Sequence, residues 1–570
     1  MSVSSKERGG GGADPPSLPM MKNEPGTETP SPVPSVVKEP AGLGFTPDWR
    51  FKVAFGTLSV VTLVVALDAT SLSVALPIIS FRLHGTAIQA FWAGTSFLLS
   101  STVFQPTYQL LSHIFGRKPL LLTALSLFTV GAIVAGLAHN FTTILIGRTI
   151  QGVGAGGVIA LTEVIVTDLV PLRERGKWFG FISGVWALGS VTGPVVGGAF
   201  AQNVSWRWIF WINMPFAGIG FFMIPVFLRL QYKTGDFMEK LKRVDWVGSF
   251  IFVASTTSFL IPVTWGGVMY SWSHWRTLVP LVLGGAGMIG FIFYEIYVPA
   301  EPLIRLRLFT NRSTSITYVG TVIHGMILWS MLYYLPLYYE AVKGYTPVVS
   351  GVAVFPQTFT VAPMAIVIGF AVAITGYYRW ALWLGWALTV AGTGLLVLLD
   401  VDTSTVAWIF LNLVPGAGTG ILFASMAYSI QASAPAEDQA FAVSLYSFFR
   451  AFGQSLGVAV GGVIFQNEMK RKLLLVPSVA AKAVEYSKDS AALVQVIKSM
   501  QKDLPERAEL IKTYAESLRS VWVAMCAFAA AAFSLNLLVE HYSVDVELAT
   551  EQGYAGKKKI GEGEEGEGKA

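Results

Sequence analysis

Long apolar blocks alternate with short polar segments along most of this chain. A helix that crosses a membrane needs about 20 apolar residues, and windows of that size find fourteen such blocks. They lie at 52–78, 90–111, 119–138, 142–168, 178–201, 208–229, 245–265, 277–298, 315–341, 348–374, 379–400, 404–428, 438–465 and 518–541. This pattern predicts an all-α integral membrane protein with about fourteen transmembrane helices.

Glycines inside these blocks recur at a fixed offset of 264 positions. Gly152, Gly154 and Gly156 reappear as Gly416, Gly418 and Gly420, and Gly189, Gly193, Gly197 and Gly198 reappear as Gly453, Gly457, Gly461 and Gly462. Small residues at such spacings let helices pack closely in a membrane. Because internal duplication is the usual build of secondary transporters, the offset predicts two pseudo-repeated six-helix bundles with two inserted helices between them.

The hydrophobic pattern divides the chain into five parts. We expect a disordered cytosolic tail at 1–47, an N-terminal six-helix bundle at 48–231, two inserted helices at 232–300, a C-terminal six-helix bundle at 301–543 and a disordered cytosolic tail at 544–570. The tails are predicted from their Gly, Pro and charged residues. Within the second bundle, an exofacial loop at 466–517 is expected to be partly helical, at 491–502 and 506–518.

Composition excludes an ordinary soluble domain, and the charge pattern gives an orientation. Hydrophobic residues make up 53% of the chain and charged residues 13%, whereas charged residues approach a quarter of a soluble protein. Lys and Arg concentrate in the short loops on the side of both termini, which places that side in the cytosol. The nine Lys or Arg residues of the 466–517 loop count against this orientation, although long loops follow the rule poorly.

Several kinds of chemistry are not expected from this sequence. It has no Gly-x-x-x-x-Gly-Lys-Ser/Thr phosphate loop, so ATP is not the predicted energy source. Six scattered histidines and the one cysteine, Cys526, offer no metal site. We therefore expect no enzymatic activity, no cofactor and no metal, and the small net charge of +5 does not predict a nucleic-acid partner.

The segment from Gly189 to Gly198 combines a glycine face with a proline. Glycines four positions apart allow a neighbouring helix to approach closely, and Pro194 cannot donate to the carbonyl of Ser190, which bends a helix. The repeat partner of this segment has Val458 in place of Pro194. A packing seam explains the glycines but not the proline, so we favour a mechanical role for this helix.

Three segments, taken in order, resemble the major facilitator superfamily, and specifically its fourteen-span drug:proton antiporters of the fungal efflux-pump type. The segment Gly189–Gly198 resembles the antiporter motif of the fifth helix, the segment around Arg148 resembles the fourth-helix motif, and the segment around Asp68 resembles the first-helix motif. The resemblance runs from about 48 to 542. It implies an alternating-access carrier in which Arg148 takes part in proton coupling.

The loop motif of that family, between the second and third helices, is matched only in part. His113, Gly116, Arg117 and Lys118 are the candidate residues of a cytosolic gate, with the last three fitting the basic end of the motif. Gln109 stands where the pattern has glycine, and His113 where it usually has aspartate. Asp168 and Glu174 are the two candidates for the missing carboxylate.

Asp68 and Arg148 are ionisable residues inside predicted spans, where each charge costs about 2.5–3.5 kcal/mol on insertion scales. A carboxylate that faces a cation and can take up a proton is the minimum requirement for proton exchange. The alternative is a static ion pair between two helices, and the family resemblance favours coupling. Glu163 lies about 22 Å along the helix from Arg148, so the two cannot pair; a proton relay and a side chain reaching toward the cytosol both stay open for Glu163.

Substrate recognition is assigned to polar and aromatic residues of both bundles. The candidate cavity residues are Gln151, Trp186, Tyr333, Gln357, Asn412 and Arg450. Arg450 is interpreted as a lone cation that either contacts substrate or holds the C-terminal bundle together through backbone carbonyls. A few polar anchors in apolar surroundings suit bulky organic molecules.

Together these features predict a proton-coupled secondary transporter that exports small organic compounds such as drugs, toxins or secondary metabolites. Its predicted partners are a small-molecule substrate, protons and the lipid bilayer, and the expected unit is a monomer in the plasma membrane or, alternatively, the vacuolar membrane. Asn140 and Asn203 begin glycosylation sequons on the predicted outer face. Two alternatives stay open: a carrier for a defined nutrient such as basic amino acids, and a non-transporting sensor on the same scaffold.

Overall fold

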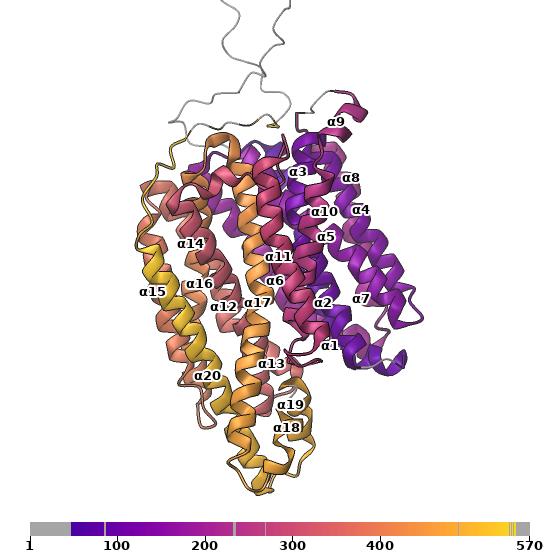
Figure 1. The fold of residues 1–570 in the computed structure, drawn as a ribbon, viewed down its shortest axis with the longest axis vertical. Coiled ribbons are helices and arrows are strands. Elements are labelled where there is room, and N and C mark those ends of the chain that lie inside the picture. The colour runs from indigo at the N-terminus through magenta and orange to yellow at the C-terminus, as the bar shows by residue number, and fades with distance from the viewer. Residues whose placement is uncertain are drawn as a thin grey trace, which may run out of the picture. The chain divides into compact units, whose positions relative to one another are not determined.

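The computed structural model describes residues 47–84, 87–231, 235–267, 269–487, 490–546, 548, 550, 552 and 553. The tail predicted at 1–47 lies, apart from residue 47, outside these residues. Within them the chain is α-helical and has no strand longer than the isolated bridge between Gly266 and Tyr270. The predicted all-α class is confirmed, and Figure 1 shows helices that run side by side along one common direction.

The helices fall into three consecutive groups along the chain. The first repeat contains α1 (Trp49–Arg82), α2 (Ala87–Val103), α3 (Gln105–Phe115), α4 (Arg117–Gly136), α5 (Phe141–Leu169), α6 (Leu172–Asn203), α7 (Trp208–Trp211) and α8 (Asn213–Phe227). It is followed by α9 (Phe237–Arg243), α10 (Trp246–Trp265) and α11 (Trp275–Tyr297). The second repeat contains α12 (Arg312–Ala341), α13 (Pro347–Ala353), α14 (Phe355–Thr375), α15 (Arg379–Leu396), α16 (Thr405–Ser433), α17 (Gln439–Leu473), α18 (Ala483–Tyr486), α19 (Ser490–Ser499) and α20 (Pro505–Asn536).

Twelve helical segments of the described chain are long and apolar enough to cross a membrane. The predicted count of fourteen is therefore not confirmed, because the expected second and eleventh spans fall on α2 with α3 and on α15, outside this set of twelve. The second span is divided at Phe104, two residues before Pro106, which lacks an amide hydrogen. Both exceptions nevertheless pack within the bundle, α2 and α3 against α5 and α15 against α16.

The glycine repeat of the sequence corresponds to a repeat of helix contacts. Helix α1 packs on α6 as α12 packs on α17, and α5 packs on α2 and α4 as α16 packs on α14 and α15. A Cβ atom added to Gly197 of α6 would overlap the backbone carbonyl of Ser71 on α1. A Cβ atom on Gly453 of α17 would likewise overlap the carbonyl of Val322 on α12. These glycines are thus required by close helix approach in both repeats.

Helix α6 continues through Pro194, from Leu172 to Asn203, so the proline does not end the helix. Its glycine face, with Gly189, Gly193, Gly197 and Gly198 buried, is turned toward its neighbours. The mechanical role of this helix stays a prediction.

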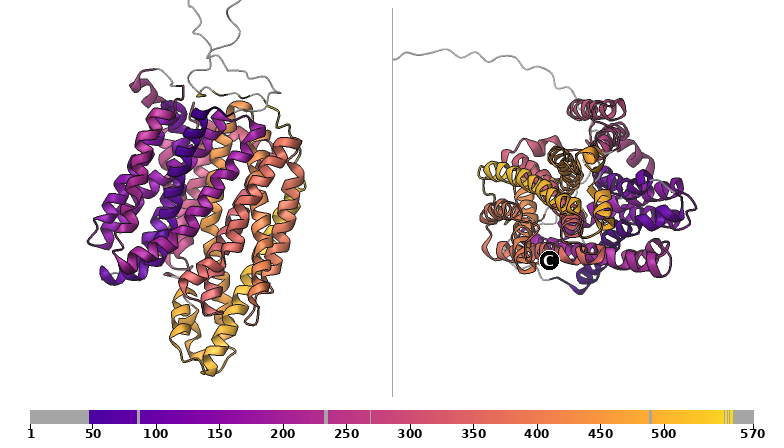
Figure 2. Two further views of the ribbon diagram at one scale, coloured as in Figure 1. Left: turned by 180° about the vertical axis from the view of Figure 1, so that it is seen from behind. Right: turned by 90° about the horizontal axis from the view of Figure 1, so that it is seen from below.

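The predicted exofacial loop at 466–517 is largely helical. Helix α17 continues to Leu473 and α20 begins at Pro505, with α18 and α19 between them. Figure 2 shows this extension projecting beyond the remaining helices. The extension has its own packed interior: Leu493, Val494 and Ile497 of α19 are buried, and Lys498 forms an ion pair of 2.7 Å with Glu340 of α12. The burial of these apolar residues explains why the segment does not form an open loop.

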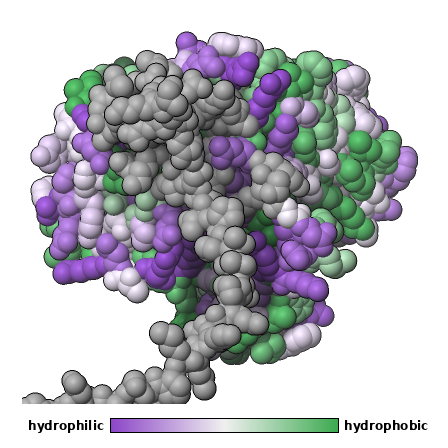
Figure 3. All heavy atoms as spheres, turned by 90° about the horizontal axis from the view of Figure 1, so that it is seen from above, coloured by the Kyte–Doolittle hydropathy of each residue, from purple (hydrophilic) through white to green (hydrophobic). Residues whose placement is uncertain are grey.

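We call the end of the bundle at which Asp48 and Gln552 lie the terminal face, and the opposite end the distal face. Figure 3 shows the terminal face, where hydrophilic side chains lie among apolar ones. Within the tail predicted at 544–570, the structure describes residues 544–546, 548, 550, 552 and 553. Val544 and Gln552 are buried, because each contacts the helix ends rather than solvent.

Candidate functional site

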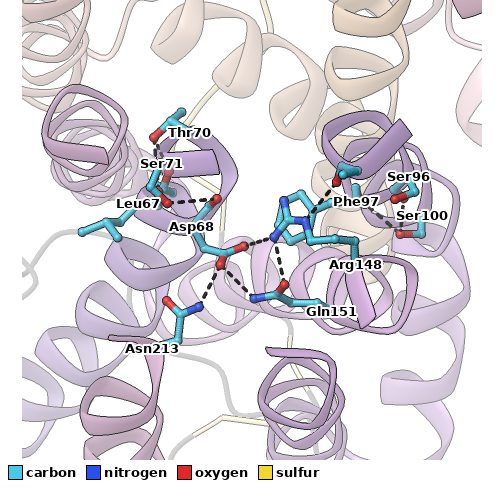
Figure 4. A network of polar contacts seen from close by, with 12 residues as sticks. Leu67, Asp68, Thr70, Ser71, Ser96, Phe97, Ser100, Arg148, Gln151 and Asn213 are labelled. Atoms are coloured by element: carbon cyan, nitrogen blue, oxygen red, sulfur yellow. Dashed lines mark hydrogen bonds and ion pairs between the residues drawn. The ribbon is translucent and has the colours of Figure 1, made fainter. Parts of the chain in front are cut away.

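Asp68 of α1 and Arg148 of α5 form an ion pair in the interior of the first repeat. Arg148 Nη1 donates to Asp68 Oδ2 at 2.5 Å, and Arg148 Nε donates to the carbonyl of Ala93 at 3.1 Å. The guanidinium also lies 4.1 Å from the ring centre of Phe97, a cation–π contact. Figure 4 shows the pair between helices that are distant in sequence. The structure therefore brings together the two residues that the sequence selects for proton coupling.

The remaining oxygen of Asp68 is occupied as well. Its Oδ1 atom accepts hydrogen bonds of 2.9 Å from Gln151 Nε2 and 2.8 Å from Asn213 Nδ2 (Figure 4). Gln151 in turn accepts from Arg148 Nη1 at 2.8 Å. Asn213 is not among the candidate site residues predicted from the sequence. An asparagine inside an apolar span is the signal that could have identified it as a partner of Asp68. Asp68 is fully buried and both its oxygens are bonded, so no solvent reaches the carboxylate in this arrangement.

A cavity of about 400 Å³ lies between the two repeats. On α17 its lining runs from Ser447 to Gln466, a distance of roughly 28 Å along the helix. It also includes Val263 and Thr264 at the distal end of α10, and Gly266 directly after that helix. The cavity therefore extends from the middle of the bundle to the distal face. Its wall is mostly apolar and includes the indole rings of Trp186 and Trp329.

Four of the six predicted cavity residues line this cavity: Trp186, Tyr333, Gln357 and Arg450. Gln151 and Asn412 do not line it. The amide of Gln151 is bound by Asp68 and Arg148. The amide of Asn412, which is fully buried, donates to the hydroxyl of Tyr339 inside the second repeat.

Arg450 is not the lone cation that the sequence indicates. Its Nη2 atom donates to Glu163 Oε1 at 2.7 Å, and both side chains line the cavity. The guanidinium is held between the rings of Phe423 and Tyr446, with centroid distances of 4.4 and 4.7 Å. Sequence reasoning treated Glu163 and Arg450 separately because 287 positions separate them. The pair joins α5 of the first repeat to α17 of the second.

Several polar atoms around this pair accept or donate no hydrogen bond within the described residues. They are Glu163 Oε2, Arg450 Nη1, Thr162 Oγ1, Gln105 Oε1, Gln357 Nε2 and Ser447 Oγ, and all six residues line the cavity. Buried polar groups without partners are costly and mark places where a ligand or water binds. The inner part of the cavity is thus a polar patch in an otherwise apolar chamber.

The gate motif at the terminal face is built around a second buried ion pair. Gly116 has φ of 100°, which allows the tight turn between α3 and α4. Arg117 Nε then donates to Asp168 Oδ2 at 2.9 Å, and Arg117 Nη1 donates to Ser112 Oγ at 2.6 Å. Of the two carboxylates proposed to replace the missing acid, Asp168 takes this position, whereas Glu174 pairs with Lys177.

The other gate residues contact different partners. His113 lies with its ring 5.2 Å from that of Phe441, and its Nε2 atom is 3.4 Å from Arg305 Nη2. Arg305 also pairs with Asp438, as does Arg307, and the hydrogen bond to Asp438 raises the pKa of Arg307. Lys118 Nζ donates to the carbonyl of Pro225 at 2.7 Å, which fastens α4 to the end of α8.

Contacts between the two repeats close the terminal face. Arg173 donates to the carbonyls of Ala373 and Ile374 at the end of α14, and the amide of Gly176 donates to Tyr428 Oη at 3.0 Å. Arg175 donates to the side chains of Gln431 and Gln439. The cavity therefore reaches the distal face and is blocked toward the terminal face.

The two glycosylation candidates lie at helix ends. The side chain of Asn140 accepts from the amide of Thr143 and caps α5, and Asn203 is the last residue of α6. Both side chains are exposed. Their modification stays a prediction.

Comparison with known proteins gives a consistent picture. The family model described as Major Facilitator Superfamily matches residues 58–458. The chain is 55% identical over 520 residues to the MFS transporter L2 of Phoma sp., covering 91% of this chain and 87% of that protein. It is 38% identical to the MFS-type efflux pump LUC4 of Fusarium sp., with 91% and 93% covered. It is 39% identical to the acurin A biosynthesis cluster MFS-type transporter of Aspergillus aculeatus, with 88% and 92% covered.

A solved structure shares the fold at low sequence identity. The human organic anion transporter MFSD10 (TETRAN) superposes with a TM-score of 0.54 at 14% identity, covering 86% of this chain and 100% of that chain. This likeness concerns the arrangement of helices alone.

Proposed function

The chain belongs to the Major Facilitator Superfamily, and from this premise we propose that it exports small organic compounds in exchange for protons. The family assignment rests on a family match across residues 58–458 and on relatives that align over most of their length. The observation that carries the proposal is the cavity between the two repeats, which reaches the distal face while contacts between the repeats close the terminal face. A carrier of this build moves its cargo by rocking one repeat against the other.

The direction of export depends on orientation. The excess of Lys and Arg in loops on the side of the chain ends supports a cytosolic terminal face. The structure is then an outward-facing state, from which substrate leaves and protons enter. Opening the terminal face requires the contacts of Arg173, Arg175 and Tyr428 to break. We propose the plasma membrane as the location, with the vacuolar membrane as the alternative, and a monomer as the working unit.

The chemistry of the cavity supports a bulky, mostly apolar organic substrate. A volume of about 400 Å³ falls in the range of pockets that hold drug-sized molecules, roughly 300–1,000 Å³. Trp186, Trp329 and Tyr333 offer ring faces, and Gln357 and Arg450 offer donors for oxygen atoms. The names of two relatives, an efflux pump and a transporter of a biosynthesis cluster, support secondary metabolites as the class.

Proton coupling is assigned to acids held by arginines inside the bundle. Asp68 is bonded to Arg148, Gln151 and Asn213, so a proton that reaches its carboxylate competes with these three donors. The nutrient alternative, a carrier for basic amino acids, is less supported, because the acid that lines the cavity, Glu163, is already neutralised by Arg450.

The test is transport by the purified protein in liposomes with an imposed pH gradient and a panel of labelled fungal metabolites. We expect flux of at least one compound against its gradient, driven by protons moving the opposite way. The matched variants are Asp68→Asn and Arg148→Ala, which should uncouple flux from the gradient. Flux that ignores the proton gradient would instead indicate a uniporter, and absence of any flux would favour a sensor.

A further inference from the structure

We propose that Glu163 is the first residue to take up the exchanged proton from the cavity, before Asp68, and that its protonation releases α5 from Arg450 of α17. This inference rests on the proposed proton-coupled export and deepens it. Two acids lie inside the bundle, Asp68 and Glu163. They differ in whether they line the cavity, in whether a carboxylate oxygen lacks a hydrogen bond, and in whether their ion pair joins the two repeats.

The first distinction is access to the cavity. Glu163 and Arg450 line it, and the cavity extends to the distal face. Asp68 does not line it and is fully buried. A proton that enters from the distal side therefore meets Glu163 before it meets Asp68.

The second distinction is bonding. Both oxygens of Asp68 are occupied, Oδ1 by Gln151 and Asn213 and Oδ2 by Arg148. In contrast, Glu163 has one oxygen on Arg450, while its Oε2 accepts no hydrogen bond within the described residues. A free carboxylate oxygen beside a cavity is the place where a proton adds without first breaking another bond.

The third distinction is what each pair connects. Asp68 and Arg148 both belong to the first repeat, so their bond survives a rigid rotation of one repeat against the other. Glu163 and Arg450 belong to different repeats, and their bond of 2.7 Å must break when the terminal face opens. A protonated, uncharged Glu163 loses the charge-assisted part of this bond. The ring faces of Phe423 and Tyr446 keep Arg450 in place while the bond is open.

The charges that face Glu163 from the neighbouring helices do not alter this assignment. On α17 the ionisable groups beside Glu163 are Arg450 and Tyr446, and the Tyr446 hydroxyl donates to the carbonyl of Phe423 at 2.8 Å. On α3, Tyr108 packs beside Gly157, one and a half turns earlier on α5. Beyond Arg450, on α12, His324 is buried with Nε2 3.0 Å from the carbonyl of Thr419. Helix α2 has no ionisable residue.

The other helices that pack on α5 carry their charges elsewhere. On α4, Arg117 is bound to Asp168 and Lys118 to a backbone carbonyl. On α1, Asp68 is bound to Arg148, and Arg50 and Lys52 lie at the terminal end. On α6, the charged residues Arg173, Glu174, Arg175 and Lys177 all lie in the first two turns and bind partners at the terminal face. Arg450 is thus the cation in direct contact with Glu163.

The test needs no substrate, because it follows the opening of the terminal face directly. Cys526 is the one cysteine of the chain, so Cys526→Ser gives a cysteine-free background. Ala373→Cys then reports opening, since Ala373 is buried at the end of α14 where Arg173 crosses from the other repeat. Reaction of full-length protein with a water-soluble maleimide is measured at pH 8 and pH 5.5. Each rate is divided by that of Thr310→Cys, an exposed position, to remove the pH dependence of the thiol.

We expect the normalised rate in the parent to rise about tenfold at pH 5.5, as an ion pair between the repeats is lost. Glu163→Gln should react fast at both pH values, and Glu163→Asp, which still titrates, should keep the pH response. Asp68→Asn should keep it as well. A pH response that persists in Glu163→Gln, or that disappears only in Asp68→Asn, overturns the assignment, as does a parent without any response.

The liposome experiment separates this inference from the proposed function. Flux driven by a pH gradient with an unaltered response in Glu163→Gln would leave proton-coupled export intact and remove Glu163 from it. Flux that ignores the gradient in the parent would remove the proposed function itself. Size-exclusion profiles of Glu163→Gln and Glu163→Asp establish that both variants are folded.

Discussion

Arg175 donates a hydrogen bond of 2.6 Å to the side chain of Gln439, the residue 264 positions later that is its own repeat partner. Thr167 and Gln431 have the same offset, and the hydroxyl of Thr167 donates to Gln431 Oε1 at 3.4 Å. A two-fold rotation that exchanges the repeats moves each residue onto the position of its partner. Residues that contact their own partners must therefore lie close to the rotation axis. The axis reaches the terminal face beside Arg175, where the two repeats have to separate.

Arg175→Lys should weaken the closed terminal face. The arginine donates to the carbonyl of Val170 and to the amide oxygens of Gln431 and Gln439, and a lysine cannot reproduce this fork. Each lost hydrogen bond is worth about 1 kcal/mol, or roughly fivefold in population. We expect the maleimide reactivity of Ala373→Cys to rise about fivefold or more. Arg207→Lys is the control, because Arg207 donates to Ala138 within the first repeat; an equal rise there would contradict the prediction.

Asp168→Asn should lower the thermal stability of the protein far more than Glu174→Gln. Arg117 is only 3% exposed and loses its carboxylate partner in the first variant. Leaving a buried charge without its counter-ion costs about 3–5 kcal/mol. Glu174 pairs with Lys177 at a partly exposed position, where an ion pair is worth about 0–1 kcal/mol. Thermal unfolding of the detergent-solubilised protein measures the stability of both variants. Equal midpoints for the two variants would show that Asp168 is not the functional substitute for the missing aspartate.

Gly197→Ala should destabilise the first repeat by about 1–3 kcal/mol, the usual range for overpacking. A Cβ atom at Gly197 would meet the backbone of Ser71, which cannot move aside without shifting α1. Gly218→Ala is the matched control, because Gly218 of α8 has no atom within 4 Å of an added Cβ. The midpoint of thermal unfolding should fall for Gly197→Ala and stay unchanged for Gly218→Ala. Unchanged midpoints in both would mean that the close approach of α1 and α6 is not required for stability.

How far the sequence predicts this molecule depends on whether a feature is local. The apolar blocks and the glycine offset predict the helices and the repeat, since both follow from spacing along one helix. The Asp68–Arg148 pair was reached through motifs that lie within single helices. The Glu163–Arg450 pair was missed, because only the fold brings positions 287 residues apart into contact. The predicted cavity residues follow the same rule. Trp186 and Gln357 line the cavity. Gln151 and Asn412 are hydrogen-bonded to residues on other helices, and the hydrophobic pattern of one helix does not reveal such contacts.

The segment after Val544 was predicted from its composition as a tail, and composition does not show that single polar residues can satisfy a helix end. Gln552 accepts from the amide of Arg117 at 3.0 Å and donates to the carbonyls of Ser112 and His113 at 3.3 Å each. Thr550 donates to Asp168 at 3.0 Å, on the oxygen that Arg117 leaves free. A segment that follows the second repeat thereby fastens the gate loop of the first.

Gln552→Ala should therefore loosen the terminal face without unfolding the bundle. Three hydrogen bonds of a buried side chain are lost, each worth about 1 kcal/mol, and all three join the segment after the second repeat to the end of α3 and the start of α4. We expect the normalised reactivity of Ala373→Cys to rise while the thermal midpoint changes little, because the helices themselves keep their contacts. Thr550→Val should act in the same direction and more weakly, since it removes one bond to Asp168. Gln501→Ala, at an exposed position of the distal extension, is the control. Reactivity that is the same in Gln552→Ala and Gln501→Ala would mean that the segment rests on the gate without holding it closed.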